Sequence, residues 1–183
     1  CSAAELSRVL EGGSSEVGIE STIVDMSRLA THGPVLLRPG HISAQQIAAV
    51  IGMLPVAPDQ AAPRASGTLE SHYAPRTQVT MLAAEGLADT LSRLHTKGVK
   101  VALISHALPA TLAASAHAHR VLPADPAGYA YGLYAALRDM DQTGAGLILV
   151  ETPPQDAAWL GVNDRLRRSV FGSAGVIDAL LQK

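Results

Sequence analysis

The sequence predicts a mixed α/β protein whose second half is a small Rossmann-like domain built on a parallel sheet. The main observation is that short aliphatic runs alternate with helix-like apolar stripes over residues 77–183. This order is typical of a parallel sheet that helices cover on both faces. The composition agrees, because 48% of the 183 residues are hydrophobic and only 16% are charged, which is enough apolar material for a sizeable core.

Residues 1–52 form a first block in which helices and strands are mixed. Two stretches have the capping-box spacing that marks a helix start, Ser2 to Glu5 and Ser43 to Gln46. Runs rich in β-branched and aliphatic residues between them indicate strands. The expected elements are a helix ending at residues 12–13, strands over 17–26 and 35–37, and a helix through Ile47 and Ile51.

Residues 53–76 separate the two blocks and follow neither period. The stretch is rich in proline, which cannot continue a helix and cannot donate a hydrogen bond within a central strand. A segment of this length without regular structure is usually a binding loop or a disordered connector. The pattern leaves both interpretations open.

Strand and helix then alternate regularly over residues 77–183. One predicted helix carries Leu133, Tyr134, Leu137 and Met140 on a single stripe, which indicates core packing rather than a ligand site. The expected strands are 79–82, 99–104, 121–122 and 147–151, and the expected helices are 87–94, 108–117, 127–141, 163–170 and 176–181.

The charge and cysteine content bear on several classes of function. A formal net charge of -2 argues against a broad electrostatic grip on nucleic acid or an anionic membrane, although a local basic patch stays open. The single Cys1 cannot form an internal disulfide, so we expect a cytoplasmic protein. No apolar run is long enough to cross a membrane. Because Cys1 leads directly into a helix-like pattern, we expect a C-terminal piece of a longer protein.

Two short polar stretches could carry chemistry. Glu20, Ser21 and Thr22 lie inside an otherwise apolar strand, so they must be hydrogen-bonded if buried, either to the protein or to a ligand. Arg38 ends the next predicted strand, before a Pro-Gly turn. At such a position α/β folds bind ligands and a guanidinium can bind phosphate, and the other interpretation is a solvated charge.

The remaining charged groups favour a structural interpretation. Asp164, Arg165, Arg167 and Arg168 are predicted to form a solvated helix face. The two histidines of the stretch 117–119 are expected to face water near a helix end.

Four motifs follow one another along the chain: VGIESTIVD at 17–25, VLLRPGHIS at 35–43, SGTLESHYAPRT at 66–77 and GVNDRLRRS at 161–169. Together they resemble the Sua5 subfamily of the Sua5/YciO/YrdC proteins, which are threonylcarbamoyl-AMP synthases. The resemblance implies three parts. These are the C-terminal part of a YrdC-like α/β catalytic domain in 1–52, an inter-domain linker that acts as a lid in 53–76, and a Rossmann-like Sua5 domain in 77–183.

The resemblance also implies an activity. Enzymes of this family are nucleotidyltransferases that condense L-threonine, bicarbonate and ATP into threonylcarbamoyl-AMP and pyrophosphate, with Mg²⁺ shielding the phosphates. Threonylcarbamoyl-transferase proteins then use the product to modify adenosine 37 of tRNAs. We therefore expect these transferases as partners, with tRNA as a further candidate and no membrane.

By the same resemblance, Tyr73 of the HYAP lid and Arg38 contact ATP, and Ser21 belongs to the threonine pocket. The Lys-x-Arg and Ser-x-Asn segments of the family do not occur upstream of Glu20, Ser21 and Thr22, which we call the EST triplet. The catalytic residues are therefore expected upstream of this chain, and the chain alone is expected to be inactive.

Two other functions stay open at this point. Residues 77–183 could be a non-catalytic regulatory or nucleotide-binding module. An independent nucleotide-binding Rossmann domain is disfavoured, because no G-x-G-x-x-G motif occurs.

Overall fold

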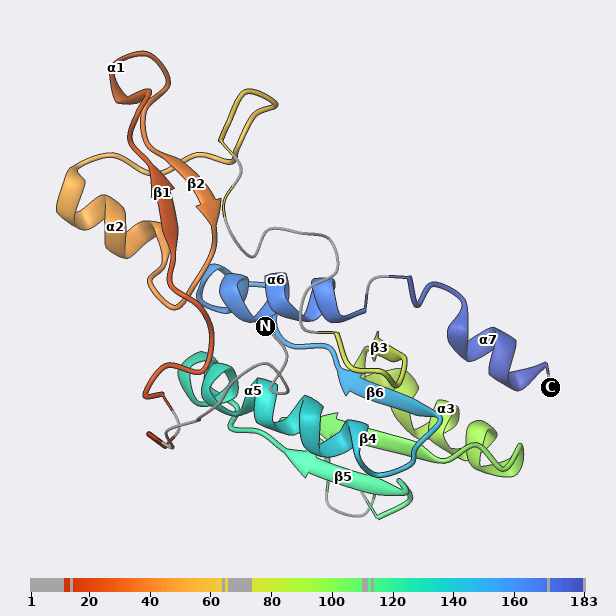
Figure 1. Ribbon diagram of the computed structural model, residues 1–183. Coiled ribbons are helices and arrows are strands. Elements are labelled where there is room, and N and C mark those ends of the chain that lie inside the picture. Colours follow the sequence, from red (N-terminus) through yellow and green to blue (C-terminus); the bar gives the residue numbers. More distant parts are fainter. Residues whose placement is uncertain are drawn as a thin grey trace, which may run out of the picture.

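The computed structural model describes residues 12–13, 15–63, 65, 74–109, 112, 114–170 and 172–182. We call residues 15–63 the hairpin unit and the described residues from 74 to 182 the sheet unit. In Figure 1 most of the hairpin unit lies away from the sheet, and part of its chain approaches helices α5 (Pro126–Asp141) and α6 (Leu160–Ser169). The helix expected before residues 12–13 lies outside the described residues.

The hairpin unit contains a two-stranded antiparallel sheet. The strand expected over 17–26 is wrong in length, because residues 16–19 bend and only residues 23–25 pair. Proline at position 39 explains the limit, since it has no N–H to continue the ladder beyond the pair of Ile23 and Arg38. The elements are β1 (Ile23–Asp25), α1 (Leu29–His32), β2 (Val35–Arg38) and α2 (Ala44–Ile51).

The capping box predicted at the start of α2 is confirmed. The Ser43 hydroxyl accepts from the Gln46 N–H at 3.2 Å, and the Gln46 side chain accepts from the Ser43 N–H at 2.8 Å. The helix ends at Gly52, whose φ of 77° is left-handed. No residue of α2 is buried, and Val50 is 85% exposed.

The irregular segment begins within the hairpin unit. Its described residues between α2 and β3 (Val79–Leu82) contain no helix or strand, as the sequence predicts. Val56 forms an isolated parallel bridge with Val35, and Arg28 pairs with Asp59 at 2.9 Å. These contacts tie the first part of the segment to β2 and to the start of α1.

The sheet unit is a four-stranded parallel sheet in the order β3-β6-β4-β5, which confirms the predicted parallel α/β architecture. Its further elements are β4 (Val101–Ser105), β5 (Ala118–Val121), β6 (Leu147–Glu151), α3 (Ala84–Thr96), the 3₁₀ turn η2 (Ala157–Trp159) and α7 (Val176–Leu181).

Side chains alternate between the two faces of the central strands, as the pleat requires. Ile104 and Ile148 pack with α5 and α6 on one face. Leu103 and Leu149 pack with α3 and α7 on the other face. Since all four side chains are fully buried, both faces are covered, in agreement with the sequence pattern.

The helix expected over 108–117 is wrong for most of its described residues. Leu112 is the one helical residue among those described, and Ser115 closes a turn onto its carbonyl at 3.2 Å. The chain then joins the sheet earlier than predicted, because β5 begins at residue 118. His119 therefore does not face water as predicted, since it lies on β5 with its Nε2 2.8 Å from the Ser105 hydroxyl.

Candidate functional site

Ser21 and Arg38, the two predicted substrate residues that the structure describes, are in direct contact. The Nε and Nη2 atoms of Arg38 donate to the Ser21 carbonyl at 3.0 and 2.9 Å, and Nη2 also lies 3.3 Å from the Ser21 hydroxyl. Arg38 is only 7% exposed, so the solvated interpretation of this arginine is wrong. The contact holds the EST triplet against the end of β2.

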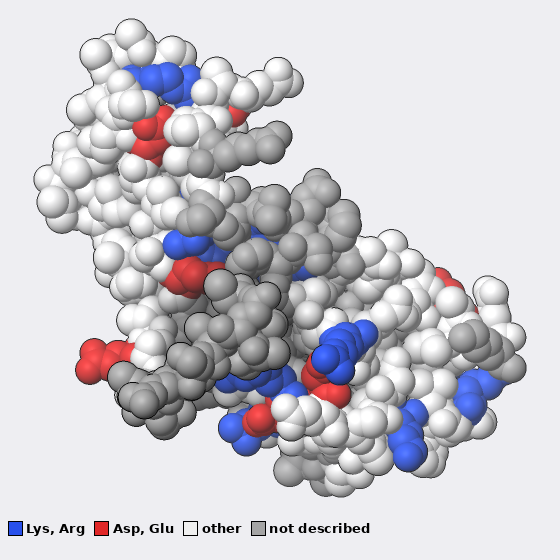
Figure 2. Space-filling view, in the orientation of Figure 1, with Lys and Arg blue, Asp and Glu red and all other residues white. Residues whose placement is uncertain are grey.

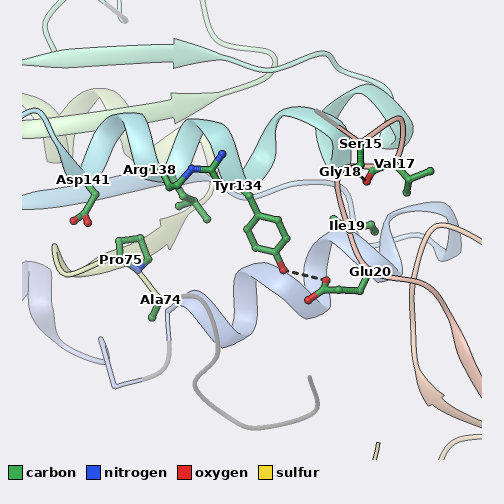
Figure 3. A pocket seen from close by; sticks show the side chains of 11 residues that line it. Ser15, Val17, Gly18, Ile19, Glu20, Ala74, Pro75, Tyr134, Arg138 and Asp141 are labelled. Atoms are coloured by element: carbon green, nitrogen blue, oxygen red, sulfur yellow. Dashed lines mark hydrogen bonds between the residues drawn. The ribbon is translucent and has the colours of Figure 1, made fainter. Parts of the chain in front are cut away.

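Glu20 joins the hairpin unit to the sheet unit. Its Oε2 accepts from Arg165 Nε on α6 and from the Tyr134 hydroxyl on α5, the latter at 3.1 Å (Figure 3). Burial alone would raise the pKa of Glu20, but its own backbone N–H, the charge of Arg165 and the Tyr134 hydroxyl together lower it. Glu20 is therefore ionised at neutral pH and forms a salt bridge between the units.

This lowered pKa predicts a pH-dependent contribution to stability. A depressed carboxyl pKa stabilises the folded state above the ordinary value of 4.5, and the contribution is lost as the pH falls through the lower folded-state pKa. We expect Glu20→Gln to lower the Tm by a few degrees at pH 7, since about 1 kcal/mol shifts the Tm of a protein of this size by about 2–4 °C. The difference from the parent chain should shrink below pH 4.5.

Thermal melts followed by circular dichroism between pH 3 and pH 7 measure this. The matched control is Glu16→Gln, which removes an exposed carboxylate four residues earlier. A Glu20→Gln deficit that stayed constant down to pH 3 would show that the ionised carboxylate is not what joins the units.

The charged run on α6 is not the solvated face that the sequence predicts. Asp164, Arg165 and Arg168 are 6%, 2% and 8% exposed, and only Arg167 has an exposed side chain. The Asp164 carboxylate accepts from Arg165 at 2.6 Å, from Arg167 at 2.7 Å and from Arg168 at 2.9 Å. The prediction is wrong because the sequence of α6 alone does not show whether another element covers its charged face. In the structure the hairpin unit lies against α6.

Glycines allow this close approach of the two units. A Cβ at Gly161 would lie 2.6 Å from the Gly40 carbonyl oxygen and 2.9 Å from Ile19 Cδ1, and a Cβ at Gly18 would lie 2.2 Å from the Ala130 carbonyl oxygen. No side chain fits at such distances. Because Ile19 also belongs to the hydrophobic core of the sheet unit, the two units share one core.

A pocket of about 490 Å³ opens between the units, at the end of the irregular segment (Figure 3). Ala74 and Pro75 form part of its wall, so the residues that follow Tyr73 reach this pocket. Tyr73 itself lies outside the described residues. The polar groups of the lining include the Glu20 carboxylate and the Tyr134 hydroxyl, which are hydrogen-bonded to each other on one side of the pocket.

Asp141 fixes the point at which the irregular segment enters the sheet unit. Its carboxylate accepts from the N–H of Thr77 at 2.8 Å and from the N–H of Arg76 at 3.3 Å. Burial alone would raise the pKa of Asp141, but the N–H of Thr77 and the N–H and charge of Arg76 lower it. The end of the predicted lid is therefore anchored on α5.

Residues 42–170 match the protein family described as "Threonylcarbamoyl-AMP synthase, C-terminal domain". The chain belongs to this family. A threonylcarbamoyl-AMP synthase of Pyrococcus abyssi is 31% identical over an alignment of 178 residues, and the match covers 88% of this chain and 48% of the relative. The corresponding protein of Bacillus subtilis is 28% identical over an alignment of 171 residues, and the match covers 90% of this chain and 49% of the relative. The chain therefore spans about half the length of the curated relatives that it matches.

Solved structures of the same family share the fold. The crystal structure of P. abyssi Sua5 complexed with L-threonine matches with a TM-score of 0.75 and 27% identity, covering 92% of this chain and 50% of that one. A variant of P. abyssi Sua5 with an adjacent His and Tyr replaced by Ala matches with a TM-score of 0.65 and 27% identity, covering 87% and 45%.

The carboxyl edge of the parallel sheet, where α/β folds commonly bind ligands, is filled by side chains in this family member. The Glu151 carboxylate accepts from the N–H of His106 at 2.7 Å and from the N–H of Ala107 at 3.1 Å. The rings of His106, Tyr129 and Trp159 pack together with centroids 5.3–5.9 Å apart. Burial and the charge of Glu151 raise the pKa of the Tyr129 hydroxyl, which therefore stays neutral.

Three further observations concern the described part of the chain as a whole. Among the described residues, no group of three or more His, Cys, Asp or Glu side chains could hold a metal ion. Within the described helices, none is long and apolar enough to span a membrane. On the face drawn in Figure 2, basic and acidic side chains are interspersed rather than gathered in one band.

The sequence did not reveal the bridge from Glu20 to Arg165 and Tyr134. One signal was present, because a carboxylate inside an apolar strand needs a cation or several donors. The pattern gave no way to identify that cation, since 145 positions separate Glu20 from Arg165.

Proposed function

We propose that this chain is the C-terminal part of an L-threonylcarbamoyladenylate synthase, a nucleotidyltransferase that makes threonylcarbamoyl-AMP and pyrophosphate from L-threonine, bicarbonate and ATP. The observation that carries the proposal is the structural match, at 27% identity, to P. abyssi Sua5 complexed with L-threonine. The longer protein that the proposal implies is called the complete enzyme below.

The proposed domain order is the C-terminal part of a YrdC-like catalytic domain in 1–52, a lid in 53–76 and a Sua5 domain in 77–183. The hairpin unit supports this division, because it leaves large apolar side chains exposed on α2 and in the segment that follows α2. Val50, Leu54 and Val56 are 85%, 57% and 51% exposed. A domain completed by further strands and helices would cover such residues.

We assign Ser21 to the threonine pocket, and Arg38 and Tyr73 to ATP. The contact between Arg38 and Ser21 supports the assignment of both residues to one site. Arg38 donates to the Ser21 carbonyl and lies 3.3 Å from the Ser21 hydroxyl. The adjacent His72 and Tyr73 form the one His-Tyr pair in the sequence. A His-Tyr pair was also the target of the double replacement in P. abyssi Sua5.

In the proposed reaction, a carbamate oxygen of N-carboxylated threonine attacks the α-phosphorus of ATP and pyrophosphate leaves. Positive charge from Arg38 stabilises the developing charge on phosphate, and a closed lid excludes water from a product that would otherwise hydrolyse. Mg²⁺ would enter with ATP as part of the substrate. The remaining catalytic groups are assigned to residues upstream of this chain.

The product would pass to threonylcarbamoyl-transferase proteins that modify adenosine 37 of tRNAs, in the cytoplasm. The alternative function, a regulatory or nucleotide-binding module, is less well supported. The edge of the sheet where a nucleotide would bind holds the Glu151 carboxylate on the N–H groups of His106 and Ala107. A phosphate would have to displace that carboxylate.

Mass spectrometry of reaction mixtures tests the function. The complete enzyme should form threonylcarbamoyl-AMP, and omission of threonine, bicarbonate or ATP should each abolish it. Equilibrium binding of ATP to residues 77–183 provides the test of the alternative. Micromolar binding there, with no product from the complete enzyme, would favour the module and overturn the synthase.

A further inference from the structure

The structure assigns Arg165 of α6 the role of a positioning residue for both substrate segments, an inference that rests on the proposed function. Its guanidinium donates through Nε to Glu20, the neighbour of Ser21, and through Nη2 to the carbonyl of Pro39, the neighbour of Arg38, at 3.3 Å. One side chain of the sheet unit thus reaches the residues adjacent to both proposed substrate contacts.

Arg165 is itself held firmly. Its side chain is 2% exposed, and Nη1 donates to the Asp164 carboxylate at 2.6 Å. The hydroxyl of Ser169, one turn further along α6, donates to the Arg165 carbonyl at 3.1 Å. A buried guanidinium with a fixed backbone and several partners has little freedom to change rotamer. The position of Glu20 is therefore set from α6.

The charges around Arg165 make Glu20 an obligatory partner rather than an incidental one. Asp164 pairs with Arg165, Arg167 and Arg168, whereas the Glu20 carboxylate pairs with Arg165. Without Glu20, the buried guanidinium of Arg165 would lose one of its two carboxylate partners and would share the other, Asp164, with Arg167 and Arg168. A buried charge without its counterion is strongly unfavourable.

The contacts continue from Arg165 to the substrate residues. Glu20 and Ser21 are consecutive, Pro39 and Arg38 are consecutive, and Arg38 donates twice to the Ser21 carbonyl. Arg165 thereby closes a loop of contacts that fixes the separation of the threonine residue from the ATP residue. Small errors in such a separation weaken substrate binding and orientation.

Steady-state kinetics of the complete enzyme test this role. Arg165→Ala should raise KM for L-threonine about tenfold, the size expected for lost positioning by a charge-assisted contact, with a smaller change in kcat. Arg165→Lys should restore part of the loss, because an ammonium can pair with Glu20 but cannot also reach Pro39 in the same geometry. The matched control is Arg167→Ala, which removes an exposed arginine bound to the same Asp164 and should leave KM unchanged.

Each outcome decides the inference. A lower kcat at unchanged KM in Arg165→Ala would indicate only a smaller folded fraction and would overturn it, as would equal effects of Arg165→Ala and Arg167→Ala. If Arg165→Ala does not fold, Arg165→Lys must raise KM for the inference to stand.

Hydrogen exchange on this chain tests the contact independently of catalysis. Faster exchange of residues 19–24 in Arg165→Lys than in Arg167→Ala supports the contact, whether or not the complete enzyme makes product. Absence of product would overturn only the proposed function.

Discussion

Gly161→Ala is expected to destabilise the chain, although alanine is the better helix former. In an isolated helix this change would be favourable by about 1 kcal/mol. Here the new methyl group would lie 2.6 Å from the Gly40 carbonyl oxygen and 2.9 Å from Ile19 Cδ1, and overpacking of this kind costs about 1–3 kcal/mol. The backbone of Gly40 cannot move aside without disturbing the contacts of Thr22 and Glu20, which lie within 2.5 Å of a Cβ at that position.

The control is another helical glycine with room around it. The atoms nearest to a Cβ at Gly86 in α3 would belong to the flexible side chain of Leu82, at an ordinary 3.4 Å. Gly86→Ala should therefore raise the Tm slightly while Gly161→Ala lowers it by several degrees. Thermal denaturation of the parent chain and the two variants measures both effects. Equal behaviour of the two variants would mean that α6 and the hairpin unit are not packed as described.

Arg38→Ala in the complete enzyme should reduce kcat/KM for ATP by about 10–100-fold, because charge-assisted hydrogen bonds contribute about 1.5–3 kcal/mol each. The structure adds a second reason, since the change also leaves the Ser21 carbonyl without two of its donors. KM for L-threonine should therefore rise together with KM for ATP.

Tyr73→Ala should weaken ATP binding by a similar or smaller amount, about 1–3 kcal/mol for one desolvated aromatic and polar contact. Its ATP-free Tm should equal that of the complete enzyme without the substitution, and ATP should stabilise it less.

Arg28→Ala serves as the control for Arg38→Ala, because Arg28 pairs with Asp59 on the same unit and lies outside the proposed site. An Arg38→Ala enzyme that retained normal kinetics for both substrates would remove Arg38 from the site.

Local signals in the sequence predicted much of the fold. The capping box at Ser43 and the fully buried strand over 147–151 were read correctly because each depends on neighbouring residues. The failures concern tertiary cover. Whether a charged helix face is solvated, or how far a strand continues, depends on elements distant in sequence, as α6 and the bent residues 16–19 show.

The candidate site was predicted less completely. Ser21 and Arg38 were assigned to the site through motifs, and their roles stay predictions; the pattern could not show that the two residues touch each other. The bridge between Glu20 and Arg165 joins residues far apart along the chain, so no periodicity could reveal it. The role of Tyr73 stays a prediction, since that residue lies outside the described part of the chain.

The most direct measurement compares residues 1–183 with the complete enzyme for pyrophosphate release from ATP. If this chain supplies the lid, Ser21 and Arg38 but not the remaining catalytic groups, the complete enzyme should release pyrophosphate only when threonine and bicarbonate are both present. The chain alone should release none above background under the same conditions. Threonine- and bicarbonate-dependent release by residues 1–183 alone would contradict the division of the active site proposed here.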